Sequence, residues 1–414
     1  MLRAITAYII AFGAVAAWAP YLAVYYNKEL GISLPAVGLL MAMTSSVSLV
    51  CAPVWGSLHD HHPESRLLLP LAAGVASIGA FGLWSAGPSP LLAGSAALFA
   101  IGVSGLMPMM DVRVLEMVSA DRTRYAQVRV WGSISFIVLA PLVGLLTVAH
   151  GLHALFWVMI PGLFLGGLAA TMLPGRSTTI KAPSLRHAPG AVLRHRPIGL
   201  FLIGAFVGWT AVASQNTFFT IYLVQLGAPT DLAGSAWSIA ALLEVPTMFF
   251  FPVLARRFGV ERLIILGALI LVVRQAANVI FTDPNVLIAA SLLQGAGYGL
   301  MLIGAITFVS HQAPKGTAAT AQGIFNAVAG SLASIVGSGV GGQLAGLLTI
   351  RGLYAISACL GLLAVVLIAA AVLPVARAAS EAPAPEPLPA PEHPPAPESA
   401  PRPPPAFGRP PSAG

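Results

Sequence analysis

Long apolar runs recur along the chain up to about residue 374, and short polar connections separate them. A helix needs about 20 predominantly apolar residues to cross a lipid bilayer. The sequence lacks the strict alternation of a β-barrel, so the runs predict helices. Twelve membrane spans are expected, at about residues 4–26, 35–57, 67–86, 90–118, 127–148, 153–173, 197–225, 232–255, 263–281, 285–311, 319–345 and 352–374.

The composition places the chain among integral membrane proteins. Of its 414 residues, 57% are hydrophobic and only 8% are charged, and the mean hydropathy is +0.85. A water-soluble protein of this length does not need so much apolar surface. The formal net charge of +7 does not indicate nucleic-acid binding, because the basic residues lie between apolar runs, where they orient a protein in the membrane. The predicted fold class is an all-α integral membrane protein.

Lysine and arginine residues are concentrated in alternate connections. The positive-inside rule assigns the more basic set of connections to the cytoplasm. The opposite set holds only Lys28 and Arg351. Both termini are therefore expected in the cytoplasm, and the membrane is expected to be the inner (plasma) membrane. The basic connections hold Arg66; Arg122 and Arg124; Arg176, Lys181, Arg186, Arg194 and Arg196; Arg256, Arg257 and Arg262; and Lys315.

The longest connection between spans falls between the sixth and the seventh, and weak sequence echoes on its two sides indicate two related halves. Ala126-Gln127 opens span five, and Ala321-Gln322 opens span eleven. Secondary transporters are often built from such repeats, with the solute site at their interface. The sequence predicts an N-terminal six-helix bundle at 1–173, a basic cytoplasmic loop at 174–196, a C-terminal six-helix bundle at 197–374 and a disordered Pro/Ala/Glu-rich tail at 375–414.

Charged residues lie deep within four of the predicted spans. A charge at membrane depth costs at least about 2.5 kcal/mol, so by default it faces a polar interior and has a function. Asp111 and Arg129 offer a carboxylate and a planar guanidinium to a polar solute, and a structural ion pair between helices is the alternative. Glu244 and Arg274 could load and release a proton together, or could form a permanent salt bridge.

Uncharged polar side chains also occur at membrane depth. Some of them are expected to line a cavity and others to hydrogen-bond between helices. The candidates for solute binding are Gln215, Asn216 and Gln294. Three clustered histidines, in contrast, are expected to be solvated loop residues and not a metal site: His59, His61 and His62.

Several short motifs resemble those of the major facilitator superfamily. The run 56–60 (GSLHD), followed by Arg66, is similar to the superfamily's motif between helices two and three. The chain most resembles the branch of the lactose and phenylpropionate permeases. The segments that carry this resemblance are 128–133 (VRVWGS), 248–252 (MFFFP), 273–274 (VR) and the glycine-rich 323–342. The resemblance covers about residues 1–374 and implies a major facilitator fold of twelve transmembrane helices in two six-helix halves.

The resemblance also implies roles for individual residues in the first half. Asp111 falls where lactose permease has its sugar-binding glutamate, and Arg129 falls on the arginine that follows it. Phe136 falls on the aromatic residue that stacks on the sugar. A gating loop is implied by Gly56, Asp60 and Arg66.

In the second half, the resemblance leaves the proton site open. Arg274 falls on the arginine of helix nine, but Gln294 and Gly297 replace the helix-ten residues that handle the proton in lactose permease. Glu244 is the remaining carboxylate deep in this half, so we expect it to carry the proton, with Arg274 as its partner.

The expected function is secondary active transport. The chain has no nucleotide-binding motif, so energy must come from an ion gradient or from the solute's own gradient. We predict a monomeric proton-coupled symporter of a sugar, a nucleoside or an aromatic acid, working in the lipid bilayer by alternating access. The alternatives are a proton-coupled exporter of drugs or metabolites, and a scaffold or receptor that does not transport. No enzymatic activity, cofactor, metal or nucleic-acid partner is expected.

Overall fold

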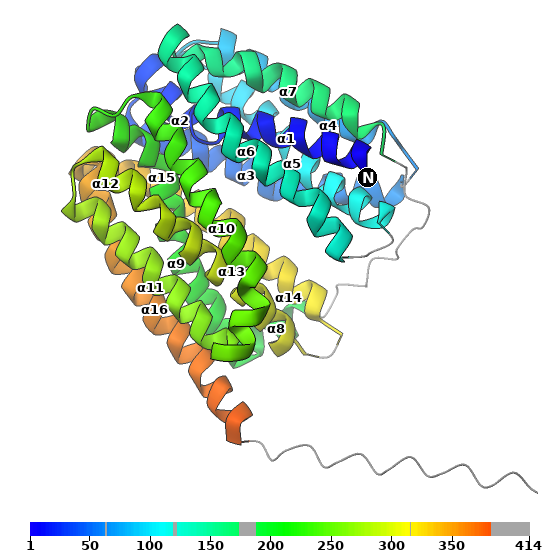
Figure 1. Ribbon diagram of the computed structural model, residues 1–414, viewed down its shortest axis with the longest axis vertical. Helices are drawn as coiled ribbons and strands as arrows, with labels where there is room; N and C mark the ends of the chain where they lie inside the picture. The colour runs from blue at the N-terminus through cyan, green and yellow to red at the C-terminus, as the bar shows by residue number, and fades with distance from the viewer. Residues whose placement is uncertain (63, 119–121, 174–187, 315, 382–414) are drawn as a thin grey trace, which may run out of the picture.

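The computed structural model describes residues 1–62, 64–118, 122–173, 188–314 and 316–381. All regular secondary structure within these ranges is helical (Figure 1). Two segments, η1 and η3, are π-helical, and η2 is a 3₁₀ turn. The elements are α1 (Leu2–Trp18), α2 (Leu22–Val24), η1 (Tyr25–Glu29), α3 (Leu34–His61), α4 (Leu68–Ser85), α5 (Leu91–Met117), α6 (Arg122–His150), η2 (Leu152–Ala154), α7 (Leu155–Ala170), α8 (Ala188–Arg194), α9 (Arg196–Gln225), α10 (Thr230–Phe258), α11 (Val260–Ile280), α12 (Pro284–Ala289), α13 (Ser291–Gln312), α14 (Ala318–Phe325), η3 (Asn326–Leu332), α15 (Ala333–Leu348) and α16 (Ile350–Glu381).

In the described part of the chain, 12 helical stretches are long and apolar enough to cross a membrane. This confirms the predicted number of spans and the all-α class. Four spans are assembled from shorter pieces: the first from α1, α2 and η1, the sixth from η2 and α7, the tenth from α12 and α13, and the eleventh from α14, η3 and α15. The π-helical η3 therefore interrupts the middle of a span, and such interruptions are frequent at functional sites.

The structure differs from the sequence prediction at two places. Helix α16 continues to Glu381, beyond the expected end at 374, because the segment 375–381 is rich in good helix formers and the next proline is Pro383. Helix α8 forms inside the predicted basic loop. The rest of that loop, 174–187, and the predicted tail from 382 onward lie outside the described residues.

The helices pack in two groups, which Figure 1 shows as a group coloured from blue to bluish green and a group coloured from green to orange. We call α1 to α7 the N-terminal half; within it α1 packs on α6 and α7, and α5 packs on α3 and α4. We call α8 to α16 the C-terminal half; within it α9 packs on α15 and α16, and α13 packs on α10 and α11. The two halves meet along two helix pairs, α3 with α15 and α6 with α10. The residue limits of the predicted bundles stay a prediction.

The two ends of the bundle differ in charge. We call the basic face the end at which α1 begins and α3 ends, and we call the other end the opposite face. Three arginines mark the basic face near helix ends: Arg66, Arg196 and Arg257.

At the opposite face the two halves are in close contact. The hydroxyl oxygens of Thr147 and Thr230 lie 2.8 Å apart, across the contact of α6 with α10. Gly38 of α3 faces Gly342 of α15 so closely that a Cβ atom at Gly38 would lie 2.7 Å from the Gly342 Cα. Glycine at both positions lets the two helix backbones touch, which closes the space between the halves toward this face.

The structure also corrects the position of the predicted gating loop. Gly56 and Asp60 lie within α3, and only Arg66 lies in the connection that follows. His59 is buried, with 2% of its surface exposed, and is therefore not the solvated loop residue that we expected. Its Nε2 accepts a hydrogen bond of 3.2 Å from the Nε of Arg113, which also donates to the carbonyl of Ser65. The buried guanidinium thus ties the end of α3 and the following turn to α5.

Candidate functional site

A cavity of about 320 Å³ lies between the two halves, and we call it the charged chamber. Helices α1 and α6 supply its wall on one side, and α9, α10 and α13 supply it on the other. Charged, aromatic and amide side chains share the wall with small apolar residues. The residues that carry chemistry are Phe12, Arg129, Ser133, Phe136, Asn216, Trp237, Glu244, Gln294 and Tyr298.

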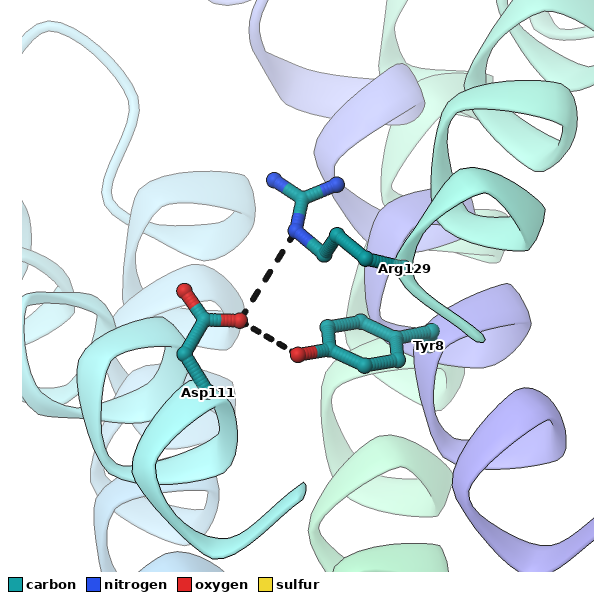
Figure 2. A network of polar contacts seen from close by, with 3 residues as sticks. All are labelled: Tyr8, Asp111 and Arg129. Carbon is teal, nitrogen blue, oxygen red and sulfur yellow. Dashed lines mark hydrogen bonds and ion pairs between the residues drawn. The ribbon is translucent and has the colours of Figure 1, made fainter. Parts of the chain in front are cut away.

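Arg129 of α6 enters the chamber beside Asp111 of α5. The Nε of Arg129 lies 3.7 Å from Oδ1 of Asp111, and the hydroxyl of Tyr8 donates a 2.5 Å hydrogen bond to that same oxygen (Figure 2). Tyr125 adds a second phenol beside this carboxylate. Asp111 is not one of the chamber-lining residues, so its visible role is to hold Arg129 from one side.

The guanidinium of Arg129 keeps its outer edge available. Its carbon lies 4.1 Å from the centre of the Phe12 ring, which supports it by a cation–π contact. Figure 2 shows the two terminal nitrogens pointing away from Asp111. In the described part of the chain these nitrogens have no hydrogen-bond partner. A planar fork of free donors is suited to bind oxygen atoms of a solute.

Glu244 of α10 faces the same chamber from the C-terminal half. The chamber-lining residues Trp237, Ala241 and Glu244 recur at helical spacing along α10, so one face of this helix forms the wall. The Arg129 charge acts on the carboxylate of Glu244 across the chamber. A carboxylate from the C-terminal half and a guanidinium from the N-terminal half therefore face the same cavity.

Amide and aromatic side chains complete the chamber. Gln294 of α13 donates a 3.3 Å hydrogen bond from its Nε2 to the Oδ1 of Asn216 on α9. The Oε1 of Gln294 has no partner within the described residues, so it is an unused acceptor. Phe136 and Arg129 both line the chamber, because they lie on the same face of helix α6. The structure thus brings together five of the predicted residues: Arg129, Phe136, Asn216, Glu244 and Gln294.

Besides Asp111, two predicted residues do not line the chamber. Arg274 is 2% exposed and Gln215 is 1% exposed, and neither lines a described cavity between the halves. With its amide oxygen turned toward Arg274, Gln215 accepts hydrogen bonds from Nη2 at 3.1 Å and from Nε at 3.2 Å. The guanidinium also lies 4.2 Å from the centre of the Phe219 ring and 3.5 Å from the Oγ of Ser291.

The expected partnership between Glu244 and Arg274 is accordingly not present. Among the described residues, the two side chains form no ion pair, because Glu244 faces the chamber while Arg274 points into the interior of the C-terminal half. Helix α11 presents Arg274 toward α9 and α13, which supply its three contacts.

Two further chambers adjoin the first. A chamber of about 310 Å³ shares Asn216 and Tyr298 with the charged chamber and lies within the C-terminal half. A third, of about 260 Å³, shares Gly330 and Ser334 with the second. It is lined by hydroxyl side chains of both halves and by aromatic side chains of the N-terminal half. The three chambers adjoin one another through these shared residues.

Sequence reasoning missed the aromatic lining. Phe12, Trp237 and Tyr298 were hidden among the many apolar residues of their spans. A signal was present, since Tyr8 and Phe12 are one turn apart on α1, and Trp237 lies two turns before Glu244 on α10. An aromatic residue on the helix face of a membrane-depth charge is therefore a useful marker of a cavity wall.

Comparison with known proteins identifies the family. Residues 2–355 match the model of the MFS_1 like family. The maltose permease of Geobacillus stearothermophilus is 29% identical over 346 residues, which cover 81% of this chain and 86% of that protein. The transporter YwbF of Bacillus subtilis (strain 168) is 25% identical over 358 residues, with 86% of this chain and 89% of that protein covered.

Solved structures share the fold. The crystal structure of a point mutant of the nucleoside transporter NupG matches with a TM-score of 0.80 at 15% identity, covering 89% of this chain and 99% of the NupG chain. A bacterial homologue of the human lysosomal transporter Spinster, in an inward-facing and occupied conformation, matches with a TM-score of 0.69 at 14% identity, covering 90% and 96%. The chain belongs to the MFS_1 like family of the major facilitator superfamily and is a multi-pass membrane protein that acts as a secondary transporter of small solutes, not as an enzyme.

Proposed function

We propose that the protein is a proton-coupled symporter of a small polar solute of the sugar class. The observation that carries this proposal is the pair of opposite charges across the charged chamber, Arg129 from the N-terminal half and Glu244 from the C-terminal half. A solute bound between them contacts both halves at once. Binding is then linked to the relative movement of the halves, as alternating access requires.

The sugar class is supported by the chamber wall and by one relative. A sugar offers hydroxyl groups to a guanidinium and to amides, and it offers apolar ring faces to aromatic side chains. The wall provides both, with Arg129 and Gln294 beside Phe12, Phe136 and Trp237. The similarity to a maltose permease points the same way. A nucleoside is the second candidate, since it shares these chemical features.

Glu244 is the proposed proton carrier. It is the single carboxylate among the described residues that line the three chambers. An ionised carboxylate that is closed off from water costs several kcal/mol, and a bound proton removes that charge. Closing the chamber around a bound solute is therefore favoured when Glu244 also carries a proton. This couples the movement of the solute to the proton gradient.

In the proposed orientation the protein lies in the inner membrane and its basic face is turned toward the cytoplasm. Both termini are then on the cytoplasmic side. The halves are in contact at the opposite face, through Thr147 with Thr230 and Gly38 with Gly342. Asp111 and Arg129 remain 37% and 33% exposed near the basic face. These contacts and exposures support a conformation that is open toward the cytoplasm.

Uptake into proteoliposomes tests the proposal. Labelled maltose should accumulate inside vesicles when the outside is made acidic, and dissipating the pH gradient with a protonophore should abolish accumulation. Export of preloaded sugar driven by an acidic exterior would instead identify an exporter. Solute binding without transport under either gradient would identify a receptor and overturn the proposal.

A further inference from the structure

A cavity of about 770 Å³ lies at the basic face, and we call it the basic pocket. It shares no lining residue with the three chambers. The elements around it are the start of α1, the turn between α3 and α4, the end of α5 and the segment that follows α7, all in the N-terminal half. Its volume is within the range of ligand pockets, about 300 to 1,000 Å³. The described residues that line it are Met1, Leu2, Arg3, Arg66, Met117 and Met172.

Two exposed arginines give the basic pocket its charge. Arg3 lies in the first turn of α1, and Arg66 lies in the turn before α4. Within the described residues neither guanidinium has a hydrogen bond or an ion pair, and no carboxylate lines the pocket. The charge of the buried Arg113 on α5 acts on Arg66, and the carboxylate of Glu116 on the same helix offsets part of it. Two guanidinium groups without partners are suited to bind phosphate oxygens.

Apolar side chains form the rest of the pocket wall. Leu2 is 76% exposed and Met172 is 56% exposed, although both are large and hydrophobic. Met117, the last residue of α5, adds a third apolar side chain. A small soluble anion would use only the two guanidinium groups and would leave the apolar surface in contact with water. A phosphate that carries hydrocarbon chains would cover both parts of the wall.

Two of the helices that end at the pocket, α4 and α7, lie on the outside of the bundle. They pack on each other, and within the described residues they contribute nothing to the three chambers. Figure 1 shows α7 on the side of the N-terminal half that lies away from the C-terminal half. Near the pocket, Leu71 of α4 and Leu165 and Leu168 of α7 are exposed. Hydrocarbon chains attached to a headgroup in the pocket can therefore lie along these two helices.

We propose that the basic pocket binds the headgroup of an anionic phospholipid. Its phosphate accepts hydrogen bonds from Arg3 and Arg66, and its acyl chains lie against Met172 and the outer surface of α4 and α7. Basic pockets between membrane helices are suited to such headgroups on the cytoplasmic side, which is the basic face in the proposed orientation. Because every lining residue belongs to the N-terminal half, the lipid stays bound when the two halves move relative to each other.

Native mass spectrometry of the full-length protein in detergent tests the inference, with phosphatidylglycerol and phosphatidylcholine supplied in equal amounts. The parent should retain one phosphatidylglycerol in preference to the zwitterionic lipid. An arginine near anionic headgroups contributes about 1 kcal/mol, so Arg3→Gln should lower the affinity for phosphatidylglycerol about fivefold, and the Arg3→Gln/Arg66→Gln double variant about 25-fold. The affinity for phosphatidylcholine should not change in either variant.

The matched control is the double variant Arg256→Gln/Arg257→Gln. It removes two charges from the same face, but both arginines are exposed at the end of α10 and do not line the basic pocket. The control should keep the preference for phosphatidylglycerol. An equal loss in the control would assign the preference to the overall charge of the basic face and overturn the inference. If the Arg3→Gln/Arg66→Gln protein does not fold, Arg3→Gln alone decides, because Arg3 is exposed and lies at the start of its helix.

A competition experiment separates a lipid from a soluble anion. Inorganic phosphate should not displace the bound phosphatidylglycerol, because it cannot cover the apolar part of the wall. Displacement by millimolar phosphate, or equal retention of the two lipids by the parent, would overturn the inference. Failure of the proposed symport leaves these results unchanged, since they measure binding at the basic face and not the uptake of solute.

Discussion

Arg129 and Arg274 are both arginines within membrane spans, yet their surroundings are opposite in kind. Arg129 is 33% exposed, lies beside the carboxylate of Asp111 and has free terminal nitrogens in a cavity. Arg274 is 2% exposed and is enclosed by an amide, a hydroxyl and an aromatic ring. Access to the cavity, and not depth in the membrane, therefore separates a residue that can bind solute from one that holds helices together.

The contacts of Arg274 indicate that it holds helices of the C-terminal half together. Gln215 and Phe219 come from α9, Ser291 comes from α13, and Arg274 itself comes from α11. One guanidinium thus joins three helices of the C-terminal half through neutral partners. Neutral acceptors and a ring face can stabilise a cation without a carboxylate, which leaves Glu244 free for the chamber.

The largest effect on binding is expected for Arg129→Lys. Lysine keeps the charge but loses the planar fork, and the loss of a charge-assisted contact of about 1.5–3 kcal/mol weakens binding by about 10- to 100-fold. The thermal midpoint of the variant should hardly change, because the terminal nitrogens have no partner among the described residues. Binding of labelled maltose to the purified protein measures the effect. Parent-like affinity would assign Arg129 to a purely structural pair with Asp111.

Arg274→Lys should show the opposite pattern, with a large loss of stability and little change in binding by the folded fraction. An ammonium group cannot make the three separate contacts of the guanidinium, and buried polar groups left unsatisfied cost about 1–3 kcal/mol. Thermal unfolding monitored together with maltose binding separates the two effects. Gln215→Leu should destabilise in the same direction. A stable Arg274→Lys protein that no longer binds solute would reverse the comparison.

A smaller effect is expected for Asp111→Asn. The ion pair with Arg129 is 3.7 Å long and both side chains are about one-third exposed, so it contributes only about 0.2–1 kcal/mol. Affinity for maltose should fall by about two- to fivefold, since the oxygen of the new amide can still accept from Tyr8 while attracting Arg129 less strongly. A loss as large as that of Arg129→Lys would make Asp111 a direct ligand of the solute.

The smallest effect is expected for truncation after Glu381. The described helix α16 ends there, so all contacts of the twelve described spans are retained. Transport rate and thermal stability should match those of the full chain, because the removed segment has the composition of a solvated extension. A clear loss of uptake in this variant would assign the tail a gating or recruiting role.

Much of the fold could be predicted from hydropathy, because lipid enforces helices of a known length and leaves few alternatives. Sequence reasoning also selected Arg129, Asn216, Glu244 and Gln294, since polar groups at membrane depth are rare. It could not choose which way each of these side chains points. Gln215 and Asn216 are adjacent in sequence, yet one holds Arg274 and the other lines the chamber, because successive residues on a helix face different directions.

The pairing of charges could not be predicted for the same reason. Glu244 and Arg274 lie on helices that are neighbours in sequence, α10 and α11, and this suggested a partnership. In the fold, α10 packs mainly on α13 and α6, and its charged face turns toward Arg129 across the chamber. Burial of His59 was likewise invisible in sequence, because its partner Arg113 comes from a different helix.

The central claim is that Glu244 links the proton to the solute, and Glu244→Gln in proteoliposomes tests it most directly. Glutamine removes the titrating group but keeps its size and hydrogen bonding. We predict that the variant exchanges labelled maltose across the membrane at the parent's rate and no longer accumulates it when a pH gradient is imposed. Exchange needs only the movement of a loaded carrier, whereas accumulation needs net movement of protons. Undiminished pH-driven accumulation by Glu244→Gln would contradict the account.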